Sequence, residues 1–383
     1  MNIGIAANTL IFEKAGIGQY GRNLLKELLK IDKKNHYFLY FSFIRHRKPR
    51  EKEIDSILGL PRASNVTVKI IPIPAAWLDF ITTTPFSIQN VIKDKIDVFF
   101  APYAAGIPKK GFSKMVFMCH DLVFMRFPEH RGKRLSNYYL KRHEIAIQNC
   151  SKIIVPSQST RKDLREFFNV PLKKIVYIPE AADKNFRPIK DRKEIERITS
   201  KYIDPKYKYI LSVGTLEPRK NLAKLVEAYS LLPHEILRQY RLILVGAKGW
   251  NNSVLERTIN DLNLQDKVIL AGFVKDEDLP YIYNGASIFV YPSLYEGFGL
   301  PPLEALACGV PTVVCDRSSL SEVVGKAGIL VNPENEKEIS LAIKRILSRP
   351  ILQEKSRRKG LLVAKKYSWK KTAEETLKVI ENL

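Results

Sequence analysis

The sequence of 383 residues has few cysteines and no long apolar run, and both shortages narrow its setting. Cys119, Cys150, Cys308 and Cys315 lie in separate apolar segments without the CxxC spacing of a metal or redox pair, so we expect buried thiols. No apolar run reaches the roughly 18 residues that a membrane span needs, and the first residues lack the charged segment of a secretory signal. We therefore expect a protein of the cytosol.

Acidic residues are also few relative to basic ones. Lysine and arginine number 63 against 40 aspartates and glutamates, a formal net charge of +23. Residues 1–180 hold 30 basic and 15 acidic residues and so carry +15, whereas the remainder, with 33 against 25, carries +8. Such an excess suits a nucleic acid or an anionic membrane surface, but a lysine-rich proteome produces it with no partner at all. Composition by itself does not choose between them.

Short apolar runs alternate with amphipathic segments in two successive series. The first begins with NIGIAAN at residues 2–8 and continues into a helical pattern with Leu24, Leu25, Leu28 and Leu29 on one face. The second begins with YKYILSVG at residues 207–214. Continuous apolarity within the runs is typical of parallel strands buried on both faces. We predict two open α/β domains whose parallel sheets face each other across a cleft, where the ligands of such sheets bind.

A polar, charged segment with prolines at both ends separates the two series. We interpret residues 184–206 as the interdomain connection, residues 1–183 as the first domain and residues 207–367 as the second. Helical patterns between the apolar runs are expected at residues 159–168, 222–232, 254–262 and 336–347.

Two glutamates, Glu296 and Glu304, flank a loop rich in glycine and proline. Glu296 follows the apolar run SIFVYPS and so lies beyond the carboxyl end of a strand. Pro301 and Pro302 suit the first turn of a helix and put Glu304 inside that turn, whose free amides offer a site for phosphate oxygens. A bare pair of glutamates at this spacing is equally explained by one solvated side chain and one that complements the helix dipole.

Two segments carry a resemblance to a known family. EGFGLPPLEALACGVPTVV, residues 296–314, resembles the glutamate-pair signature of retaining glycosyltransferases of family 4, and VGTLEPRKNLAKLVEAY, residues 213–229, resembles that family's phosphate-binding loop. Further matching segments extend the likeness over nearly the whole chain. The resemblance implies the GT-B fold, with two Rossmann-like domains, the donor nucleotide held mainly by the second, and a final helix at 368–383 that packs back on the first. The segments most resemble bacterial mannosyltransferases of surface polysaccharide assembly.

The resemblance implies roles for three side chains near the donor. Glu304 is expected to accept the ribose hydroxyls, and Glu296 to contact hydroxyls of the transferred sugar. His120, at the end of the apolar run KMVFMCH, matches the family's active-site histidine, which meets the donor sugar. A covalent route to retention needs a nucleophilic carboxylate beneath the sugar ring, and the sequence shows no convincing one. Front-face attack is therefore expected, in which the departing phosphate takes the acceptor proton.

A diphosphate leaving group gains negative charge as the sugar departs, so cationic groups aimed at it lower the barrier. Lys220 matches the family's diphosphate-binding lysine, and Arg219 takes over a further charge because Thr215 stands where the family usually has arginine. The expected catalytic residues are His120, Arg219, Lys220 and Glu296. The expected donor-binding residues are Gly18, Gly214, Thr215, Arg219, Lys220, Gly246, Glu296, Gly297, Phe298, Gly299, Leu300 and Glu304.

Two further motifs match functional signatures in spacing but not in their surroundings. GIGQYG, residues 16–21, has the spacing of a dinucleotide-binding loop, but seven residues separate it from the first strand, and Arg45 rather than an acidic residue follows the second. A dehydrogenase remains a weaker alternative, and the resemblance instead makes this loop a lid near the donor phosphate and acceptor. Asp276 and Asp278 spell the DxD of metal-dependent glycosyltransferases, yet they precede a helical pattern and are interpreted as its N-cap and acidic first turn.

The expected function is the retaining transfer of a hexose, α-mannose from GDP-mannose, to a lipid-linked or polysaccharide acceptor, without a metal or other cofactor. A glucosyl- or N-acetylglucosaminyltransferase that uses a UDP sugar is the first alternative, because the base is read by loops such as residues 246–250, for which one sequence provides no code. A non-enzymatic nucleic-acid binder is the second, although no RRM, KH or helix-turn-helix pattern accompanies the basic segments.

Two basic segments interleave aromatic residues and suggest how the first domain would meet an anionic membrane. One is residues 43–50, and the other, at helical spacing, presents Arg134, Lys141 and Arg142 beside Tyr138. A few lysines and arginines near an anionic leaflet hold a protein reversibly without any spanning segment. We expect a peripheral association with the inner face of the membrane, and the alternative is a merely solvated basic face.

Overall fold

The computed structural model describes the chain except for residues 14–15, 45–46, 60–62 and 250–252. The chain divides into two compact units. The first contains Met1–Glu180 and Ser368–Leu383, and the second contains Ala181–Tyr367. Each unit has its own parallel sheet and its own hydrophobic core.

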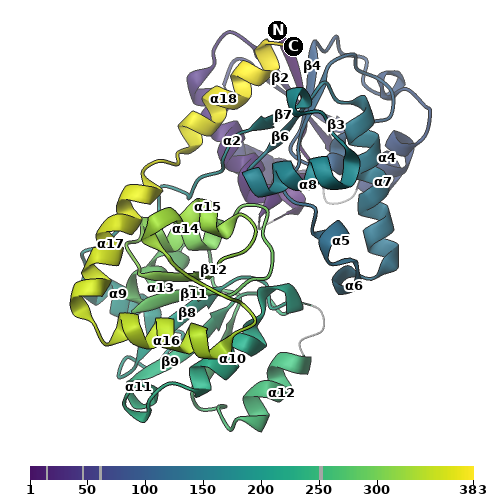
Figure 1. Cartoon of the computed structure of the whole chain (residues 1–383). Helices are drawn as coiled ribbons and strands as arrows, with labels where there is room; N and C mark the ends of the chain where they lie inside the picture. The colour runs from purple at the N-terminus through teal and green to yellow at the C-terminus, as the bar shows by residue number, and fades with distance from the viewer. Residues whose placement is uncertain (14–15, 45–46, 60–62, 250–252) are drawn as a thin grey trace. The chain divides into compact units, whose positions relative to one another are not determined.

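The first unit is built on a 7-stranded parallel sheet with the order β3-β2-β1-β4-β5-β6-β7 (Figure 1). Its strands are β1 (Asn2–Ala6), β2 (His36–Ser42), β3 (Val66–Ile71), β4 (Val98–Ala101), β5 (Met115–Met118), β6 (Lys152–Val155) and β7 (Ile175–Tyr177). The order reverses between β1 and β4, which pair from Ile3 opposite Val98. Such a reversal leaves a crevice beyond the carboxyl ends of the two strands, where open α/β sheets bind ligands.

Helices connect these strands, because parallel neighbours need crossover connections. They are α1 (Thr9–Phe12), α2 (Ile17–Ile31), α3 (Arg47–Leu58), α4 (Ala75–Thr83), α5 (Val123–Arg126), α6 (Pro128–Arg131), α7 (Lys133–Asn149) and α8 (Gln158–Phe168), with 3-10 turns η1 (Ile88–Asn90), η2 (Ala104–Gly106) and η3 (Leu172–Lys174). Leu24, Leu25 and Leu28 of α2 are buried, as their spacing predicts, whereas Leu29 is only partly buried. Ser157 caps α8 by accepting the Thr160 N–H at 3.0 Å.

The second unit repeats the plan with a 6-stranded parallel sheet of order β10-β9-β8-β11-β12-β13. Its strands are β8 (Lys208–Val213), β9 (Tyr240–Val245), β10 (Val268–Gly272), β11 (Ile288–Tyr291), β12 (Thr312–Cys315) and β13 (Ile329–Val331). The reversal here lies between β8 and β11, which pair at Ile210 and Ile288. The loops that follow β8 and β11 therefore emerge side by side.

The second sheet is covered on both faces. Its helices are α9 (Arg192–Thr199), α10 (Leu222–Ser230), α11 (His234–Gln239), α12 (Ser253–Asp261), α13 (Leu279–Gly285), α14 (Leu300–Ala307), α15 (Leu320–Val324), α16 (Glu336–Leu347) and α17 (Pro350–Ala364), with η4 (Pro218–Lys220) and η5 (Gly325–Ala327). Ile210 packs with residues of α10, α12 and α16, whereas the next residue, Leu211, packs with residues of α13, α14 and α15. Burial on both faces explains why the strands are continuously apolar.

Residues 184–206 belong to the second unit, which corrects their interpretation as an interdomain connection. Phe186 and Ile203 are buried in that unit's core, and α9 packs on α13. The segment looks polar because α9 is a short amphipathic helix whose solvent face is charged, while Ile195 and Ile198 face inward. The chain passes between the units at Glu180 and again at Tyr367.

The C-terminal helix α18 (Trp369–Glu381) packs on α2 within the first unit, and Figure 1 shows the yellow α18 beside the purple α2. The rings of Trp369 and Tyr20 meet edge to face with centroids 5.8 Å apart. The Thr372 hydroxyl donates to the Pro179 carbonyl oxygen at 2.7 Å, so the last helix is tied to the end of the segment that leaves the unit. Ile380 is fully buried.

Helix α7 corrects one part of the expected basic face. Arg134 and Lys141 are exposed on it near Tyr138, but Arg142 is 1% exposed. Its guanidinium donates to oxygens of Thr82, Ala105 and Ile107. These acceptors come from α4 and the loop after β4, so the helical spacing of α7 by itself could not reveal the burial.

The sequence predicts buried cysteines and no apolar run long enough to span a membrane. All four cysteines are buried and free, as predicted. Burial raises the pKa of the Cys150 thiol, which keeps it protonated. In the part of the chain that the structure describes, no helix combines the length and the apolarity needed to cross a membrane.

Removal of buried contacts in α18 should destabilise the first unit. Ile380→Ala deletes a fully buried side chain and is expected to cost about 2–5 kcal/mol of unfolding free energy. The matched control is Leu341→Ala on α16, whose side chain is 64% exposed and whose loss should cost well under about 1 kcal/mol. Urea unfolding followed by circular dichroism measures both. Equal midpoints for the two variants would contradict the packing of α18.

Candidate active site

Glu296 lies on the loop after β11, and its carboxylate is held from several sides. Lys220 Nζ is 2.6 Å from Oε1, and an Arg219 guanidinium nitrogen is 2.8 Å from Oε2. The Tyr291 and Ser293 hydroxyls donate to Oε1 at 2.9 and 2.6 Å. Lys220 also donates to the Tyr291 hydroxyl at 2.6 Å, so the five groups form one connected network.

The electrostatics of this network fix the charge on Glu296. Burial alone would raise the pKa of its carboxyl, but Arg219 and Lys220 outweigh burial and lower that pKa to about 2. Burial and the neighbouring Arg219 lower the pKa of the Lys220 ammonium. The carboxylate therefore allows two cations to lie close together in a buried position.

The two cations come from the turn after β8, and glycines shape that turn. Gly214 has φ +154°, and a Cβ there would lie 3.4 Å from Lys220 Cε. Gly246, at the end of β9, has φ +152°, and its Cβ would lie 2.0 Å from the Gly214 carbonyl oxygen. A side chain at Gly246 cannot be accommodated, because that contact is with backbone. Thr215, which stands at the family's arginine position, is exposed beside them.

Glu304 occupies a different environment in α14, which starts with the two prolines as predicted, but it lies beyond the first turn in which it was expected. It is 5% exposed, and the Tyr283 hydroxyl donates to its Oε2 at 2.8 Å. Burial raises the pKa of Glu304 to about 7, against the opposing effect of the Tyr283 hydrogen bond. The two glutamates of the motif therefore differ in charge state near neutrality, one ionised and one poised to titrate.

The loop between the two glutamates is braced from within the second unit. The Ser319 hydroxyl donates to the carbonyl oxygens of Glu296 and Phe298. Phe298 is buried, and Gly299 precedes α14 with φ +113°. A Cβ at Gly299 would lie 2.8 Å from Leu320, so the glycine permits both the turn and the close packing.

His120 follows β5 in the first unit, and both of its ring nitrogens have partners. Nδ1 is 3.0 Å from Glu180 Oε1, and Nε2 is 2.8 Å from the Pro102 carbonyl oxygen. A carbonyl only accepts, so Nε2 carries a proton, and an ionised Glu180 requires a second proton on Nδ1. Burial opposes charging, but the hydrogen bond and charge of Glu180 raise the pKa of His120. The geometry favours an imidazolium.

Comparison with known proteins assigns the chain to a family. A family profile described as Glycosyltransferase Family 4 matches residues 15–186, and one described as Glycosyl transferases group 1 matches residues 193–363. O-antigen chain mannosyltransferase B of Escherichia coli is 32% identical over 390 residues, covering 98% of each chain. The chain belongs to glycosyltransferase family 4.

The chain is also similar to a second characterised relative and to a solved structure. N-acetylgalactosamine-N,N'-diacetylbacillosaminyl-diphospho-undecaprenol 4-alpha-N-acetylgalactosaminyltransferase of Campylobacter jejuni is 31% identical over 236 residues, 60% of each chain. Sucrose-phosphate synthase from Thermosynechococcus elongatus has a solved structure with a TM-score of 0.78 at 20% identity, covering 100% of this chain and 98% of that one. This glycosyltransferase therefore has the GT-B fold, with two Rossmann-like domains. The family assignment replaces the dehydrogenase and nucleic-acid-binding alternatives.

Several residues that contact the predicted site residues of this glycosyltransferase were not themselves predicted from the sequence. Tyr291 and Ser293 share the carboxylate of Glu296, and Glu217 pairs with Arg219 at 2.5 Å. Their signal in the sequence is proximity, since all three lie within a few residues of predicted site residues. Tyr283 lies 21 residues before Glu304, and Glu180 lies 60 residues after His120. Those two partners are brought in by tertiary folding alone.

Gly18 lies in the first turn of α2 in the first unit. A Cβ there would lie 1.7 Å from the Glu13 carbonyl oxygen, so close packing between α1 and α2 already requires a glycine. Gly16 precedes α2 with φ +47°. Arg45, which was considered for the dinucleotide-binding alternative, lies outside the described residues. So does Trp250, the last residue of the loop that was expected to read the base.

The side chain of Asp278 in the DxD motif does not cap a helix, contrary to the prediction. Asp278 stands at the N-cap position of α13, but its side chain makes no capping hydrogen bond. It accepts the Tyr202 hydroxyl at 2.8 Å and pairs with Lys201 at 3.1 Å, because α9 packs on α13 and brings those donors to it. Among the residues that the structure describes, no group of three or more His, Cys, Asp or Glu side chains is arranged to hold a metal ion.

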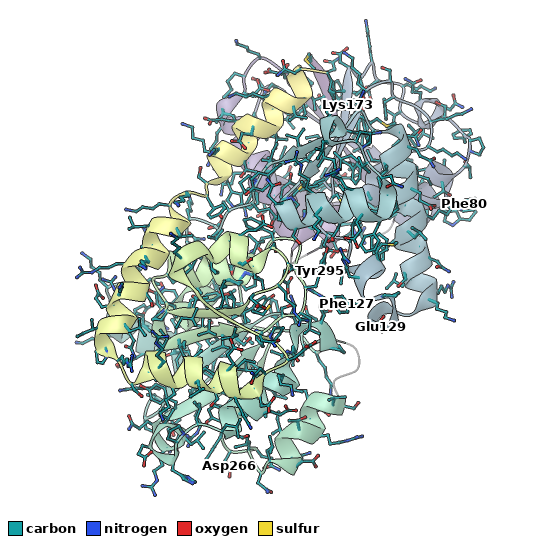
Figure 2. All side chains as sticks on the ribbon, viewed as in Figure 1. Phe80, Phe127, Glu129, Lys173, Asp266 and Tyr295 are labelled. Carbon is teal, nitrogen blue, oxygen red and sulfur yellow. The ribbon has the colours of Figure 1, made fainter. Side chains whose placement is uncertain are left out.

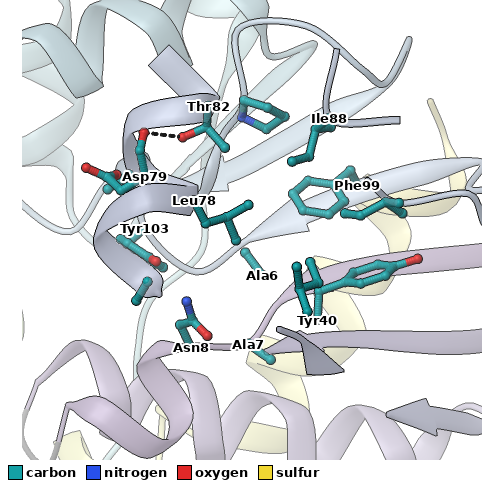
Figure 3. Close-up of a pocket in the computed structure, with 16 residues that line it drawn as sticks. Ala6, Ala7, Asn8, Tyr40, Leu78, Asp79, Thr82, Ile88, Phe99 and Tyr103 are labelled. Carbon is teal, nitrogen blue, oxygen red and sulfur yellow. Dashed lines mark hydrogen bonds between the residues drawn. The ribbon is translucent and has the colours of Figure 1, made fainter. Parts of the chain in front are cut away.

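A cavity of about 60 Å³ lies in the first unit between α4 and the ends of β1 and β4 (Figure 3). Its floor is apolar, with Leu78 and Phe99 among the lining residues. Asn8 and Tyr103 add polar groups to the lining. Figure 3 shows Leu78 and Thr82 on the cavity side of α4, together with the hydrogen bond from the Thr82 hydroxyl to the Asp79 carbonyl.

The buried state of Glu304 can be tested through the pH dependence of stability. Its folded pKa is about 7 and its unperturbed value 4.5, so its protonated form contributes stability that is complete below pH 4.5 and is lost as the pH rises through about 7. The loss is on the order of 3 kcal/mol. Glu304→Gln keeps an oxygen that accepts the hydrogen bond from the Tyr283 hydroxyl, but the glutamine side chain does not titrate. Relative to wild type, this variant should gain about that much stability between about pH 5 and pH 8.

Urea unfolding at about pH 5 and about pH 8 measures the effect on both proteins. The matched control is Glu277→Gln, because the Glu277 side chain is 76% exposed and its substitution should leave the pH dependence unchanged. A Glu304→Gln variant that follows the wild-type pH dependence would show that Glu304 is ionised in the native protein.

Lys220→Ala should lower the turnover number of this glycosyltransferase by a factor of about 10² or more, as removal of one transition-state charge donor does. The control is Lys275→Ala, since the Lys275 side chain is 73% exposed. Initial rates with the true donor, together with circular dichroism of each variant, measure the effect. A near-normal rate for a folded Lys220→Ala variant would transfer the role to Arg219.

Proposed function

We propose that the chain transfers mannose from GDP-mannose, with retention of the α configuration, to a lipid-linked or polysaccharide acceptor. The observation that carries this proposal is the likeness to the Escherichia coli O-antigen chain mannosyltransferase B, which extends over 98% of each chain at 32% identity. That likeness includes both halves of the molecule, and so includes the first half, which we propose recognises the acceptor.

The network around Glu296 supplies the chemistry that a nucleotide diphosphate sugar needs. Arg219 and Lys220 converge where the strand order of the second sheet reverses, and they are the groups that would neutralise the departing diphosphate. In this proposal the acceptor oxygen bonds to the anomeric carbon as the bond from that carbon to the phosphate oxygen breaks. The departing phosphate oxygen takes the acceptor's proton, so no protein base is required.

Glu296 itself is proposed to contact sugar hydroxyls and not to act as a nucleophile. Both of its oxygens are held by cations, and Oε1 also accepts two hydroxyls. A carboxylate held in this way is poorly placed for the covalent route to retention, which needs it free beneath the ring. Glu304, in its ionised form, is proposed to accept the ribose hydroxyls.

His120 is proposed to meet the donor sugar as a positioned cation. Its two nitrogens are occupied by Glu180 and Pro102, so it is not free to remove a proton from an acceptor. Tyr20 packs edge to face on the ring with centroids 4.9 Å apart, which fixes its orientation further. A fixed imidazolium suits stabilisation of the negative charge that develops on the leaving group.

Transfer is proposed to be independent of metal. Asp278 of the DxD motif is 5% exposed and already engaged by Tyr202 and Lys201. Arg219 and Lys220 provide the positive charge that a divalent ion supplies in metal-dependent sugar transfer. The proposal therefore requires no cofactor beyond the nucleotide-sugar substrate.

The acceptor is proposed to be lipid-linked, which would place the enzyme at the cytoplasmic face of a membrane. The Campylobacter jejuni relative carries diphospho-undecaprenol in the name of its acceptor, and the first half of this chain carries +15. The basic segment at residues 43–50 contributes little to this idea. Arg45 and His46 lie outside the described residues, and the Arg50 guanidinium stacks on Phe12 at 4.2 Å.

A second candidate is a glycosyltransferase that uses a UDP sugar. The same Campylobacter jejuni relative is named as an N-acetylgalactosaminyltransferase, and it is 31% identical over 60% of this chain. Such an enzyme would use the same cationic network, because the diphosphate is common to both donors. The candidates differ in the base and the sugar.

A panel of GDP, UDP and ADP sugars, all with EDTA present, tests the proposal. GDP-mannose should raise the melting temperature more than the other donors, since a ligand that binds only the native state stabilises by RT ln(1 + [L]/Kd). Mannose transfer to a lipid-linked acceptor should continue in EDTA. Selective stabilisation by a UDP sugar would establish the second candidate, and activity that returns only with Mg²⁺ or Mn²⁺ would contradict metal independence.

A further inference from the structure

Helix α4 in the first unit exposes large aromatic side chains to solvent. Trp77 and Phe80 are each 67% exposed, and Phe86, just after the helix, is 45% exposed. Figure 2 shows Phe80 at the outer edge of the first unit. We call these three side chains the α4 surface. Trp77 and Phe80 are three residues apart on the helix and so share one face, and an exposed apolar face of this kind is typical of an interaction site.

The charge pattern around the α4 surface is unusual for a surface helix. From Pro72 to Asn90 the sequence holds a single charged residue, Asp79, in a chain that is 27% charged. The Asp79 carboxylate accepts the Tyr138 hydroxyl at 3.0 Å and lies 3.5 Å from Arg142. The helix therefore directs its only charge toward α7 and its aromatic side chains toward solvent, whereas a surface helix ordinarily exposes its charges.

Basic residues border the α4 surface near the end of the helix. The Lys109 N–H donates to the Thr82 carbonyl oxygen at 2.8 Å, and the Ile88 N–H donates to the Lys110 carbonyl oxygen at 3.1 Å. These backbone hydrogen bonds place two consecutive lysines beside Thr82 of α4 and beside the turn that follows Phe86. Both lysine side chains are exposed.

A second basic border runs along α7. Tyr138 contacts Asp79 of α4, and Arg134 and Lys141 lie one helical turn before and after Tyr138. Both basic side chains are exposed. Since residues i, i+4 and i+7 share one side of a helix, Arg134 and Lys141 lie on the side of α7 from which Tyr138 contacts α4. The α4 surface is thus an uncharged aromatic patch with positive charge on two borders.

We propose that the α4 surface docks the first unit on an anionic lipid bilayer. Trp77 and Phe80 would enter the headgroup boundary, where aromatic side chains concentrate, and the bordering lysines and arginines would be attracted to anionic lipids. This deepens the proposed function, because it rests on a lipid-linked acceptor and names the surface that meets the lipid phase. Aromatic insertion and basic attraction together provide the two signals that stable peripheral binding requires.

Charge complementarity favours a bilayer over a second copy of the chain. In a two-fold dimer through the α4 surface, each basic border would approach the same border of the partner, and like charges would repel. An anionic leaflet instead offers negative charge on every side of the patch. The same borders that oppose self-association therefore favour the membrane.

Vesicle sedimentation with the full-length protein tests the proposal. Wild type should pellet with vesicles of phosphatidylglycerol at low ionic strength, should be released as salt shortens the Debye length below about 8 Å, and should remain in the supernatant with phosphatidylcholine vesicles. Trp77→Ser combined with Phe80→Ser should lower the partition coefficient at least about tenfold. The matched control is Ile351→Ser combined with Leu362→Ser on α17, where the side chains are 87% and 64% exposed.

The control variant should bind vesicles like wild type. Equal binding by the two double variants would overturn the proposal, as would equal recovery of wild type with anionic and neutral vesicles. A wild-type dimer that light scattering shows to dissociate in the Trp77→Ser, Phe80→Ser variant without vesicles would overturn it in favour of a second copy.

Tryptophan fluorescence provides a readout that does not depend on a folded double variant. The Trp77 emission of wild type should shift to shorter wavelength with phosphatidylglycerol vesicles and be quenched by brominated lipid, because the ring leaves water. Trp77→Phe should abolish that response and retain binding, since an aromatic side chain remains. An unchanged response in Trp77→Phe would show that Trp77 does not enter the bilayer.

These measurements separate docking from sugar transfer. Vesicle binding requires no donor, and Trp77→Ser with Phe80→Ser should retain whatever thermal stabilisation GDP-mannose gives wild type, because the cationic network lies in the second unit. Docking without selective stabilisation by GDP-mannose would contradict the proposed donor alone. Selective stabilisation without docking would contradict the α4 surface alone.

Discussion

The ionised carboxylate of Glu296 is the interaction on which the second unit's site depends. Two cations, Arg219 and Lys220, lie side by side in a buried position, and without a counter-charge their mutual repulsion and desolvation would be costly. Glu296 compensates both, and Tyr291 and Ser293 satisfy its remaining hydrogen-bonding capacity. Removal of one partner from such a network leaves an unpaired buried charge, so its members cannot be changed independently. The site is held in place before any donor arrives.

Chain topology explains why these groups meet. Both sheets reverse their strand order after their first strand, between β1 and β4 and between β8 and β11. In the second unit the loops leaving β8 and β11 carry the cations and Glu296, although 76 residues separate Lys220 from Glu296. In the first unit His120 follows β5, next to β4, and contacts the carbonyl of Pro102, the residue directly after β4. Each half thus places its candidate site residues at the carboxyl ends of strands near the reversal.

Helix α4 shows how one element can serve two purposes in the first unit. Leu78 and Thr82 line the cavity (Figure 3), while Trp77 and Phe80 of the same helix are exposed to solvent. Its single charge is directed to α7, where Tyr138 and Arg142 receive it. Arg142, expected from its helical spacing to be part of a surface, is instead a buried connector between α7, α4 and the loop after β4.

The sequence alone determined the α/β class and the helix that Pro301 and Pro302 begin, because strand burial and proline at a helix start leave local patterns, whereas the role expected of Lys220 rests on the family resemblance. Only the tertiary structure decided the partners. Glu180 beside His120 and Tyr283 beside Glu304 come from distant segments, and burial, not spacing, separates the charge states of Glu296 and Glu304. Residues 184–206 appeared to be a connection because an amphipathic helix shows its buried face only once its partner, α13, is in place. Local patterns specify which groups are present, whereas desolvation and pairing between distant groups depend on packing that no local pattern contains.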